Sequence, residues 1–338
     1  MFMMRFSQRS KTGDSAARAD LYRAVLDMAS WAETRGCIAT VVSQHHAVED
    51  GYLPSPVPMA AAIAARTSNL PISVAALLLA FYEPVKLAED LAVVDLLSRG
   101  RVSYVIGIGY REEEFALFGV DRRGRGQLVE QRIEVLRRLW AGEEVEVEGR
   151  RARVTPLPYT PGGPLLLYGG GSAAAARRAG RLGMFFVAET HDATLESVYR
   201  EEAERAGVAP LGCSFPTADV PLTVFVADDP EKAWAEIGEY LLVDAVSYGR
   251  WNHDRPGTAS VSFATTVDEL RTEQSAYQVI TPDEAAASVG RGIPLALQPL
   301  VGGIPPDIAW RYFEAAATAA TPTLPSTVAA KDATSTDS

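Results

Sequence analysis

The amino-acid sequence predicts a parallel α/β fold, either a closed (β/α)8 TIM barrel or an open doubly wound sheet. Short apolar segments alternate with amphipathic helical segments along most of the 338 residues, which is the pattern of repeated βα units. Several segments are apolar at consecutive positions, as in parallel strands that are buried on both faces. Both architectures place the active site at the carboxyl ends of the strands.

Eight segments are expected to form the strands of this sheet. In chain order they are residues 4–7, 37–42, 72–79, 102–108, 164–168, 184–188, 222–227 and 294–298. Two apolar stripes at helical spacing lie between them: Leu87, Leu91, Val94 and Leu97, and then Val129, Ile133, Leu136 and Trp140. Both stripes are expected to pack against the sheet.

Two insertions and a tail interrupt this alternation. Residues 144–154, after the fourth strand, are predicted to form a hairpin that turns at Glu148-Gly149-Arg150. Residues 248–277, after the seventh strand, are polar with little periodicity and are a candidate active-site lid. The tail 321–338 is rich in Thr, Ala, Ser and Asp and is expected to be disordered, which leaves residues 1–320 as a single domain.

Charge and hydropathy exclude several kinds of partner. The net charge is −11, and no basic block stands out, so neither nucleic acid nor an anionic membrane is expected to bind. The longest apolar stretch, residues 71–82, is shorter than the ~20 residues of a membrane-spanning helix. The N-terminal residues lack the apolar core of a signal peptide, so a cytoplasmic protein is expected. Cys37 and Cys213 are too few for a disulfide framework or a zinc site.

Two adjacent histidines follow the second strand. An imidazole there can act as a general base or stabilise developing charge near neutral pH. We expect His45 to be functional, whereas His46 is expected either to hydrogen-bond within its loop or to face the substrate pocket. A metal site is not expected, because adjacent residues seldom converge on one ion and the other histidines, His191 and His253, are distant in the sequence.

Small residues follow the third and fourth strands. Ala75 and Ala76 would let a ring lie against the backbone, although small residues at a strand end usually serve packing alone. The segment Gly107-Ile108-Gly109-Tyr110-Arg111-Glu112 is not a dinucleotide fingerprint, because Glu112 replaces the third glycine. We interpret its glycines as positions that allow a flat ligand to approach the backbone.

A glycine-rich turn follows the fifth strand. The run Gly169-Gly170-Gly171-Ser172-Ala173 leads directly into an alanine-rich helix. The unpaired amide groups and the dipole of a helix N-terminus favour an anion, so a phosphate-binding turn is predicted. No Lys-Ser or Lys-Thr follows, which excludes a nucleotide-triphosphate P-loop. A helix cap without any ligand is the alternative interpretation.

Several segments resemble the bacterial luciferase-like flavin monooxygenases. They are Gln44-His45-His46, Asp50-Gly51-Tyr52-Leu53-Pro54-Ser55-Pro56, Glu83-Pro84-Val85-Lys86-Leu87-Ala88-Glu89-Asp90, Leu96-Leu97-Ser98-Arg99-Gly100-Arg101, and Glu113-Glu114-Phe115 with Phe118-Gly119. Their order and spacing match that family from about residue 4 to 318. The resemblance implies a (β/α)8 barrel that binds reduced FMN from a separate flavin reductase, and then O2. The resulting C4a-hydroperoxyflavin would oxidise a small-molecule substrate.

The resemblance also implies roles for individual residues. His45 would be catalytic, Ala75-Ala76 would be joined by a cis peptide bond under the ring, and Gly171-Ser172 would bind the phosphate. The implied cofactor-binding set is Ala75, Ala76, Gly107, Ile108, Gly109, Arg111, Gly170, Gly171, Ser172 and Ala173. The implied substrate-pocket set is His46, Tyr110, Glu189 and His191. Family members generally form dimers, so a homodimer is expected, with the apolar face Met59, Ala60, Ala61, Ile63 and Ala64 as its candidate surface.

One departure from the family opens an alternative cofactor. The luciferase catalytic subunit carries a cysteine and an arginine where this chain has Gly107 and Ile108. The loss of that arginine removes a phosphate counter-charge, so Arg111, Arg177 or Arg178 replaces it or the flavin differs, and light emission becomes doubtful. The same superfamily contains hydride-transferring enzymes that use the deazaflavin coenzyme F-420. FMN is preferred, because the paired histidines and the Ala-Ala pair resemble the luciferase branch.

Two other functions remain open from the sequence. A flavin-binding relative without turnover is possible, although a storage protein would need no base at His45. A barrel metal hydrolase would usually carry a His-x-His pair after the first strand, where this chain has Ser7-Gln8-Arg9.

Overall fold

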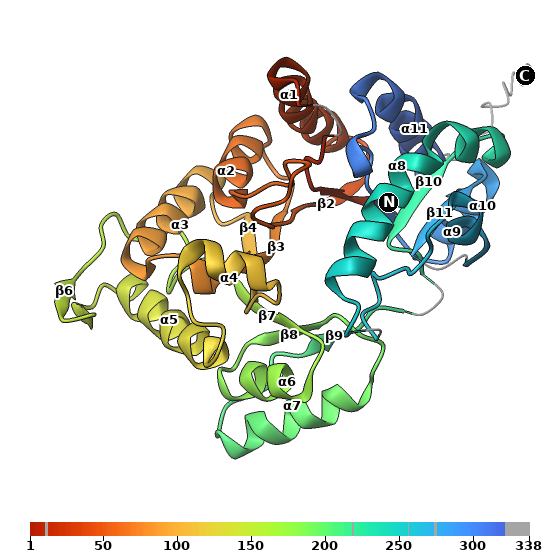
Figure 1. Ribbon diagram of the computed structural model, residues 1–338. Coiled ribbons are helices and arrows are strands. Elements are labelled where there is room, and N and C mark those ends of the chain that lie inside the picture. Colours follow the sequence, from red (N-terminus) through yellow and green to blue (C-terminus); the bar gives the residue numbers. More distant parts are fainter. Residues whose placement is uncertain (11–12, 218–219, 256, 274–275, 322–338) are drawn as a thin grey trace, which may run out of the picture.

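The structure is a computed structural model that describes residues 1–10, 13–217, 220–255, 257–273 and 276–321. Its centre is one curled sheet in which every pair of neighbouring strands is parallel, in the order β12-β1-β2-β3-β4-β7-β8-β9 (Figure 1). The strands are β1 (Phe2–Phe6), β2 (Cys37–Val42), β3 (Ile72–Leu78), β4 (Val102–Gly107), β7 (Leu166–Gly170), β8 (Phe185–Ala188), β9 (Cys213–Ser214) and β12 (Leu295–Leu297).

Helices follow most strands and cover the outer face of the sheet, as repeated βα units require (Figure 1). They are α1 (Ser15–Ala32), α2 (Pro56–Arg66), α3 (Pro84–Ser98), α4 (Glu112–Phe118), α5 (Arg125–Trp140), α6 (Ala173–Arg181), α7 (Thr194–Arg205), α8 (Pro230–Trp251), α9 (Val267–Glu273), α10 (Pro282–Gly290) and α11 (Pro306–Ala319), with 3-10 turns η1 (Leu79–Phe81) and η2 (Val301–Gly303). None of the helices in the described residues has the length and apolarity needed to cross a bilayer.

The sheet curls without closing into a complete barrel. The predicted seventh strand, β10 (Thr223–Val226), forms a separate parallel pair with β11 (Tyr277–Ile280). In the part of the chain that the structure describes, no backbone ladder joins this pair to the main sheet. Instead, the Gln298 side chain donates to the Thr223 hydroxyl over 2.5 Å. The expected closed barrel is therefore corrected to a curled eight-stranded sheet beside a two-stranded one.

Most predicted segments are confirmed, and the exceptions have physical reasons. The hairpin forms as β5 (Val145–Val147) and β6 (Arg150–Ala152). Strand β9 was missed because two residues carry no periodicity, and β11 was missed because it lies at the end of the polar segment 248–277. That segment is not one long loop, since α8 runs to Trp251 and α9 lies within it. Residues 322–338 of the predicted tail lie outside the described residues.

The two predicted apolar stripes differ in burial. All four residues of the second stripe, on α5, are buried. On α3, Leu87, Leu91 and Val94 are buried, but Leu97 is 55% exposed. The expectation that Leu97 packs against the sheet is wrong, because α3 directs only part of the stripe inward. On α2, Met59, Ala60, Ile63 and Ala64 are buried, so most of the face expected to form a dimer surface packs within the protomer instead.

Helices α6 and α7 approach closely at Gly180. A Cβ atom at this position would lie 2.4 Å from the Tyr199 carbonyl oxygen and 3.0 Å from the Ala203 nitrogen. Gly180→Ala is therefore expected to destabilise the fold by roughly 1–3 kcal/mol, because the clash is with backbone atoms of a packed helix. The matched control is Gly290→Ala, since no atom lies within 4 Å of a Cβ there. Thermal unfolding should show a lower midpoint for the first variant alone, and equal midpoints would contradict this account of the packing.

Candidate cofactor-binding and active site

The residues predicted to be functional meet at one edge of the sheet. His45, Tyr110 and Ser172 follow β2, β4 and β7, and the carboxyl ends of parallel strands lie at the same edge. The Tyr110 hydroxyl lies 3.3 Å from Nε2 of His45. The guanidinium of Arg255 stacks on the Tyr110 ring at 5.0 Å, and its Nη2 lies 3.8 Å from the Cβ position of Gly171. A continuous path of contacts thus joins His45 to the glycine-rich turn.

His45 is held by a buried carboxylate. Its Nδ1 lies 2.9 Å from Oε1 of Glu114, on α4, and both side chains are buried. The same carboxylate oxygen accepts the His46 amide at 2.9 Å and Nη1 of Arg111 at 3.3 Å. A carboxylate can only accept, so Nδ1 of His45 carries the proton and donates it to Glu114. The Nε2 lone pair is then directed towards Tyr110.

The environment sets the charges of this pair. Burial lowers the pKa of the His45 imidazole below its ordinary value, and the hydrogen bond to Glu114 opposes this effect only in part. Burial alone would raise the pKa of Glu114, but the hydrogen bonds from His45 and the His46 amide hold that pKa below its usual value. Near pH 7 the pair is therefore a neutral imidazole and an ionised carboxylate, and Nε2 can accept a proton.

Four aromatic rings surround His45. The ring centroids of Trp251, Tyr52, Tyr110 and Tyr248 lie 4.7, 4.9, 5.6 and 6.1 Å from the imidazole. The hydroxyls of Tyr52 and Tyr248 are hydrogen-bonded to each other at 2.8 Å. Tyr248 and Trp251 come from the end of α8, the start of the segment predicted to be a lid. These rings exclude water from the base, which strengthens electrostatic interactions there.

The backbone beside His45 is shaped for close approach. The peptide bond between Ala75 and Ala76 is cis, as the resemblance implied, and β3 bulges there against β4. A Cβ atom at Gly107 would lie 2.8 Å from the Ala76 Cβ, so the residue on β4 must be small. Gly109 has φ of +72°, which glycine adopts without strain. Ile108 lies between these glycines and is partly buried.

The glycine-rich turn has the geometry of an anion-binding helix start. Ser172 is the N-cap of α6, and its hydroxyl accepts the Ala175 amide at 3.3 Å. The amides of Ala173 and Ala174 lie in the first turn of α6, before the first amide that donates to the Ser172 carbonyl oxygen, and remain available to a ligand. A Cβ at Gly171 would lie 2.7 Å from Cγ2 of Thr190, and one at Gly170 would lie 2.6 Å from the Ala175 Cβ. Only glycine fits these positions.

The three arginines predicted to supply positive charge beside this turn differ in their partners. Arg111 pairs with Glu114 and stacks on Trp251 at 4.5 Å. Arg177 is exposed, and Arg178 pairs with Glu130 at 2.8 Å. Arg177 is thus the one of the three without a carboxylate partner among the described residues, and the replacement of the missing arginine by one of them stays a prediction.

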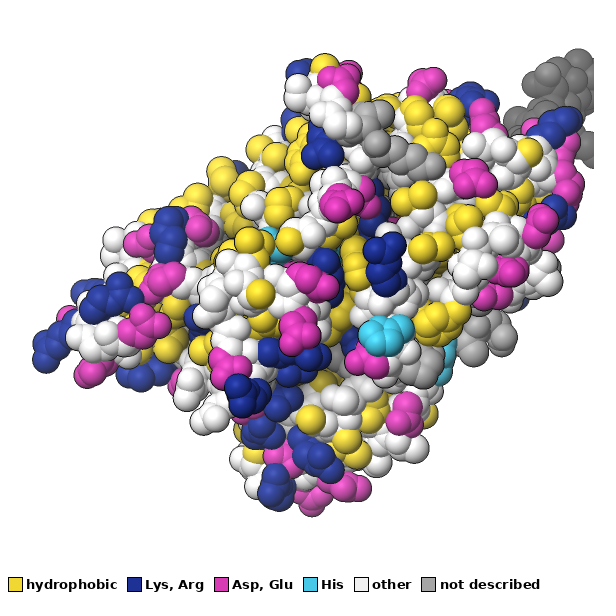
Figure 2. All heavy atoms as spheres, in the orientation of Figure 1, with side chains coloured by type: hydrophobic (Ala, Val, Ile, Leu, Met, Phe, Trp, Pro, Cys, Tyr) yellow, Lys and Arg dark blue, Asp and Glu magenta, His cyan; other side chains and the backbone are white. Residues whose placement is uncertain are grey.

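Arg122 and Arg125 instead provide uncompensated charge. Burial together with the nearby charges of Arg122, Arg178 and Arg255 lowers the pKa of Arg125. Arg125 donates to the carbonyl oxygens of Gly109 at 3.2 Å and Arg122 at 3.1 Å. Nε of Arg122 is buried without a hydrogen-bond partner, and among the described residues neither arginine forms an ion pair. Figure 2 shows the basic side chains gathered over the region where α5 and α6 meet. A cluster of this kind fits an anion.

The structure does not bring every predicted residue to the rings around His45. Glu189 is near them, because it pairs with Arg255 at 2.6 Å. The His46 ring packs instead edge-on against the stacked rings of Phe81 and Phe118, and its Nε2 lies 2.7 Å from the Gln44 amide nitrogen. His191 is exposed, and its Nδ1 contacts the Pro216 carbonyl oxygen. In the described part of the chain, no three His, Cys, Asp or Glu side chains form a group able to hold a metal.

Sequence analysis missed several residues of this site. Glu114 was part of a quoted motif, but nothing local indicated that it would meet His45, 69 positions away. Arg125 lies on a helix whose periodicity predicts packing rather than a site, and Trp251 was included only as part of the candidate lid 248–277. Arg9, which is fully buried, was considered only as a departure from a metal motif.

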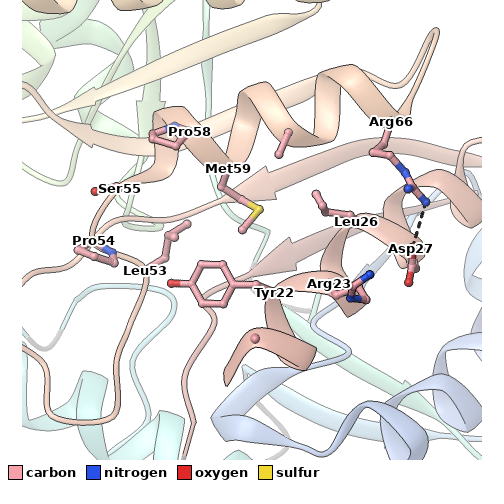
Figure 3. Close-up of a pocket in the computed structure, with 12 residues that line it drawn as sticks. Tyr22, Arg23, Leu26, Asp27, Leu53, Pro54, Ser55, Pro58, Met59 and Arg66 are labelled. Atoms are coloured by element: carbon pink, nitrogen blue, oxygen red, sulfur yellow. Dashed lines mark hydrogen bonds and ion pairs between the residues drawn. The ribbon is translucent and has the colours of Figure 1, made fainter. Parts of the chain in front are cut away.

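A surface groove of about 580 Å3 lies elsewhere, between α1 and α2 (Figure 3). Its lining includes Tyr22, Leu26, Leu53, Pro58, Met59 and Ala62. Arg66 and Asp27 form an ion pair of 3.0 Å at one end of it. It contains none of the predicted site residues, so it is not the candidate active site.

Comparison with known proteins identifies relatives of this chain in sequence. The chain is 25% identical over 311 residues to an F420-dependent glucose-6-phosphate dehydrogenase of Mycolicibacterium smegmatis, covering 86% of this chain and 91% of the relative. It is 27% identical over 145 residues to the oxygenase component of a flavin-dependent trigonelline monooxygenase of Acinetobacter baylyi, covering 41% and 40%. Relatives are thus named both for a flavin and for F420.

A solved structure and a family model complete the comparison. The monooxygenase RslO1 of Streptomyces bottropensis superposes with a TM-score of 0.71 at 25% identity, covering 94% of this chain and 98% of RslO1. The model of the luciferase-like monooxygenase family matches residues 1–292. Because that match spans most of the chain, the protein belongs to the luciferase-like monooxygenase family and is an oxidoreductase of that family.

Proposed function

We propose that this protein is a monooxygenase that uses reduced FMN and O2 to oxidise a small organic molecule, with His45 as its catalytic base. The observation that supports this most directly is the path of contacts from His45 through Tyr110 and Arg255 to the turn at Gly171. It joins a base and an anion site at one edge of the sheet, as a phosphorylated redox ring requires.

The residues present fit such a cofactor. Arg122, Arg125 and the amides around Ser172 would hold its phosphate, since they are positive or unpaired donors. The cis Ala75-Ala76 bond and Gly107 leave backbone, rather than side chains, for a flat ring to approach. When bound, reduced FMN supplies the electrons with which O2 is activated for insertion of one oxygen atom into the substrate.

The residues of the protein accept the proton and exclude water from the site. His45 accepts a proton at Nε2, while Glu114 orients the ring through Nδ1 and stabilises the imidazolium that forms. Trp251 and the three tyrosines shield this proton transfer from solvent. Glu114 therefore serves as a positioning residue that acts through His45.

Hydride transfer with coenzyme F420 is the second candidate. It is favoured by the relative of M. smegmatis, whose name specifies F420 and which aligns with 86% of this chain. The same turn and the same arginines would hold the phosphate of either cofactor. The choice between the two cofactors decides the reaction class, because deazaflavin does not form the oxygen adduct.

A paired titration tests the proposal. Reduced FMN should bind and reoxidise in air more slowly with the protein than in buffer alone, and reduced F420 should bind more weakly. Reoxidation at the buffer rate together with tight F420 binding would replace the monooxygenase with the F420-dependent enzyme. Cofactor binding with no turnover of any substrate would instead indicate a flavin-binding protein. Binding of neither cofactor would overturn both candidates.

The pH dependence should follow His45. Because burial depresses its pKa below 6.5, kcat/KM should hold its full value at pH 7 and fall only as the pH drops through that lower pKa. Glu114→Gln removes the contact that raises this pKa, so the acidic limb should move to still lower pH while kcat/KM falls. An acidic limb above pH 6.5, or one that Glu114→Gln leaves in place, would contradict the assignment.

The stability of the fold should also depend on His45. Unfolding the chain lets the imidazole take up a proton more readily, so the free energy of unfolding should decline below about pH 6.5.

Other partners remain predictions. A separate flavin reductase would supply reduced FMN in the cytoplasm. A homodimer is still expected, although not through the buried face of α2. Val93, Leu96 and Leu97 are exposed apolar side chains on α3, the helix that packs against α2.

A further inference from the structure

In the part of the protein that the structure describes, the cations around His45 are paired with carboxylates, unlike Arg122 and Arg125, which are proposed to bind the phosphate. Arg111 is matched by Glu114, and Arg255 is matched by Glu189. Arg9 forms ion pairs with two carboxylates, Asp50 and Asp244. Arg5, on β1, also acts on the Asp244 carboxylate. The ion pairs described around His45 thus match Arg9, Arg111 and Arg255 with four carboxylates: Asp50, Asp244, Glu114 and Glu189.

Arg9 is the cation most deeply placed among the rings, and two carboxylates neutralise its charge, although its Nη2 has no hydrogen-bond partner. Its side chain is fully buried, with the guanidinium 4.8 Å from the Tyr52 ring and 4.9 Å from the Trp251 ring. Its Nε lies 2.9 Å from Asp244, whose carboxylate also accepts the Tyr277 hydroxyl at 2.8 Å. An anionic group brought here would lose its hydration and face two fixed carboxylates, which makes binding unfavourable.

The rings themselves favour a flat apolar ligand. The Trp251 ring makes cation–π contacts with the guanidinium groups of Arg9 and Arg111. Its plane is tilted 50° to the imidazole of His45. Tyr52, Tyr110 and Tyr248 present further ring faces and edges around the same imidazole. Aromatic pairs in such offset or edge-on arrangements gain energy beyond the burial of area.

We propose that the substrate oxidised at His45 is an uncharged molecule that carries an aromatic or similarly flat apolar ring. The inference rests on the proposed function, which it deepens by naming the substrate class. Anions are confined to the cofactor phosphate, where Arg122 and Arg125 lack carboxylate partners among the described residues. A hexose phosphate, the substrate named for the M. smegmatis relative, is excluded by this distribution of charge.

Calorimetric titration of the FMN-loaded protein tests the substrate class. The probes are 2-naphthol, which is uncharged at pH 7, its charged counterpart naphthalene-2-sulfonate, 1-decanol as an aliphatic molecule, and glucose 6-phosphate. We expect 2-naphthol to bind at least tenfold more tightly than each of the other three. Equal or tighter binding of the sulfonate or of glucose 6-phosphate would overturn the neutral class, and equal binding of decanol would overturn the ring requirement. FMN binding is measured first, so its failure counts against the proposed function and not against this inference alone.

A variant that neutralises one carboxylate makes the test more specific. Asp50→Asn removes one of the two carboxylates on Arg9 but keeps the oxygen that accepts the Tyr52 amide at 3.1 Å. Affinity for naphthalene-2-sulfonate should rise roughly tenfold, equivalent to about 1.4 kcal/mol, with 2-naphthol unchanged. Asp27→Asn is the matched control, because it removes a carboxylate from the surface pair with Arg66 and should change neither affinity.

A second variant covers the case in which Asp50→Asn fails to fold. Glu189→Gln releases Arg255, which is only partly buried, and should also raise sulfonate affinity. If the folded variants bind the sulfonate no better than Asp27→Asn does, charge balance does not select the substrate and the inference is wrong.

Discussion

His45→Ala should lower kcat/KM by roughly 10²–10⁴-fold, the usual contribution of a positioned general base. The imidazole is buried, its Nδ1 is held by Glu114, and its Nε2 lies 3.3 Å from the Tyr110 hydroxyl. Alanine removes the proton acceptor and leaves the Glu114 carboxylate buried with fewer hydrogen bonds. The measurement is steady-state turnover with a substrate that the wild-type protein accepts.

Two comparisons separate catalysis from folding in this experiment. FMN affinity should change little in His45→Ala, because the phosphate contacts belong to the glycine-rich turn and to Arg122 and Arg125. The control is His253→Ala, which alters an exposed histidine only two residues beyond Trp251. An equal loss of turnover in both variants, or full activity in His45→Ala, would remove His45 from its proposed role.

Arg125→Ala should weaken binding of reduced FMN by roughly 10- to 100-fold, since one hydrogen bond to a charged group contributes about 1.5–3 kcal/mol. Arg125 is anchored by the carbonyl oxygens of Gly109 and Arg122, so its charge is held in place before any ligand arrives. The loss should appear as a raised dissociation constant in a fluorescence titration. It should diminish at high salt, because screening already weakens the contact in the wild-type protein.

Arg123→Ala is the matched control for this prediction. Its side chain is 96% exposed and pairs loosely with Asp121 at 3.7 Å, although it lies between the two proposed phosphate ligands in the sequence. The control should bind FMN as the wild type does. If Arg123→Ala weakens FMN binding as much as Arg125→Ala does, the effect comes from net charge and the proposed phosphate site is wrong. Unchanged affinity in Arg125→Ala would have the same meaning.

Local patterns predicted the elements of the fold better than its closure. Segments 37–42 and 72–79 were found because a buried parallel strand is continuously apolar, and the hairpin was found because Glu148-Gly149-Arg150 marks a turn. Closure of the barrel depends on which strands of the C-terminal part of the chain pair with one another. The two-residue strand β9 and the polar flank of β11 gave no signal of that pairing.

For the site, the sequence by itself determined which positions stand at strand ends and which of these are candidates to bind an anion or accept a proton. His45 and the turn at Ser172 were identifiable because strand ends and glycine-rich helix starts are local features. Only the tertiary structure decided what surrounds them. Glu114 reaches His45 over 69 residues, and Tyr248 reaches Tyr52 over 196. These contacts arise because the curling of the sheet and the packing of α4, α5 and α8 bring distant segments to one edge. The periodicity of the sequence does not indicate which distant segments will meet.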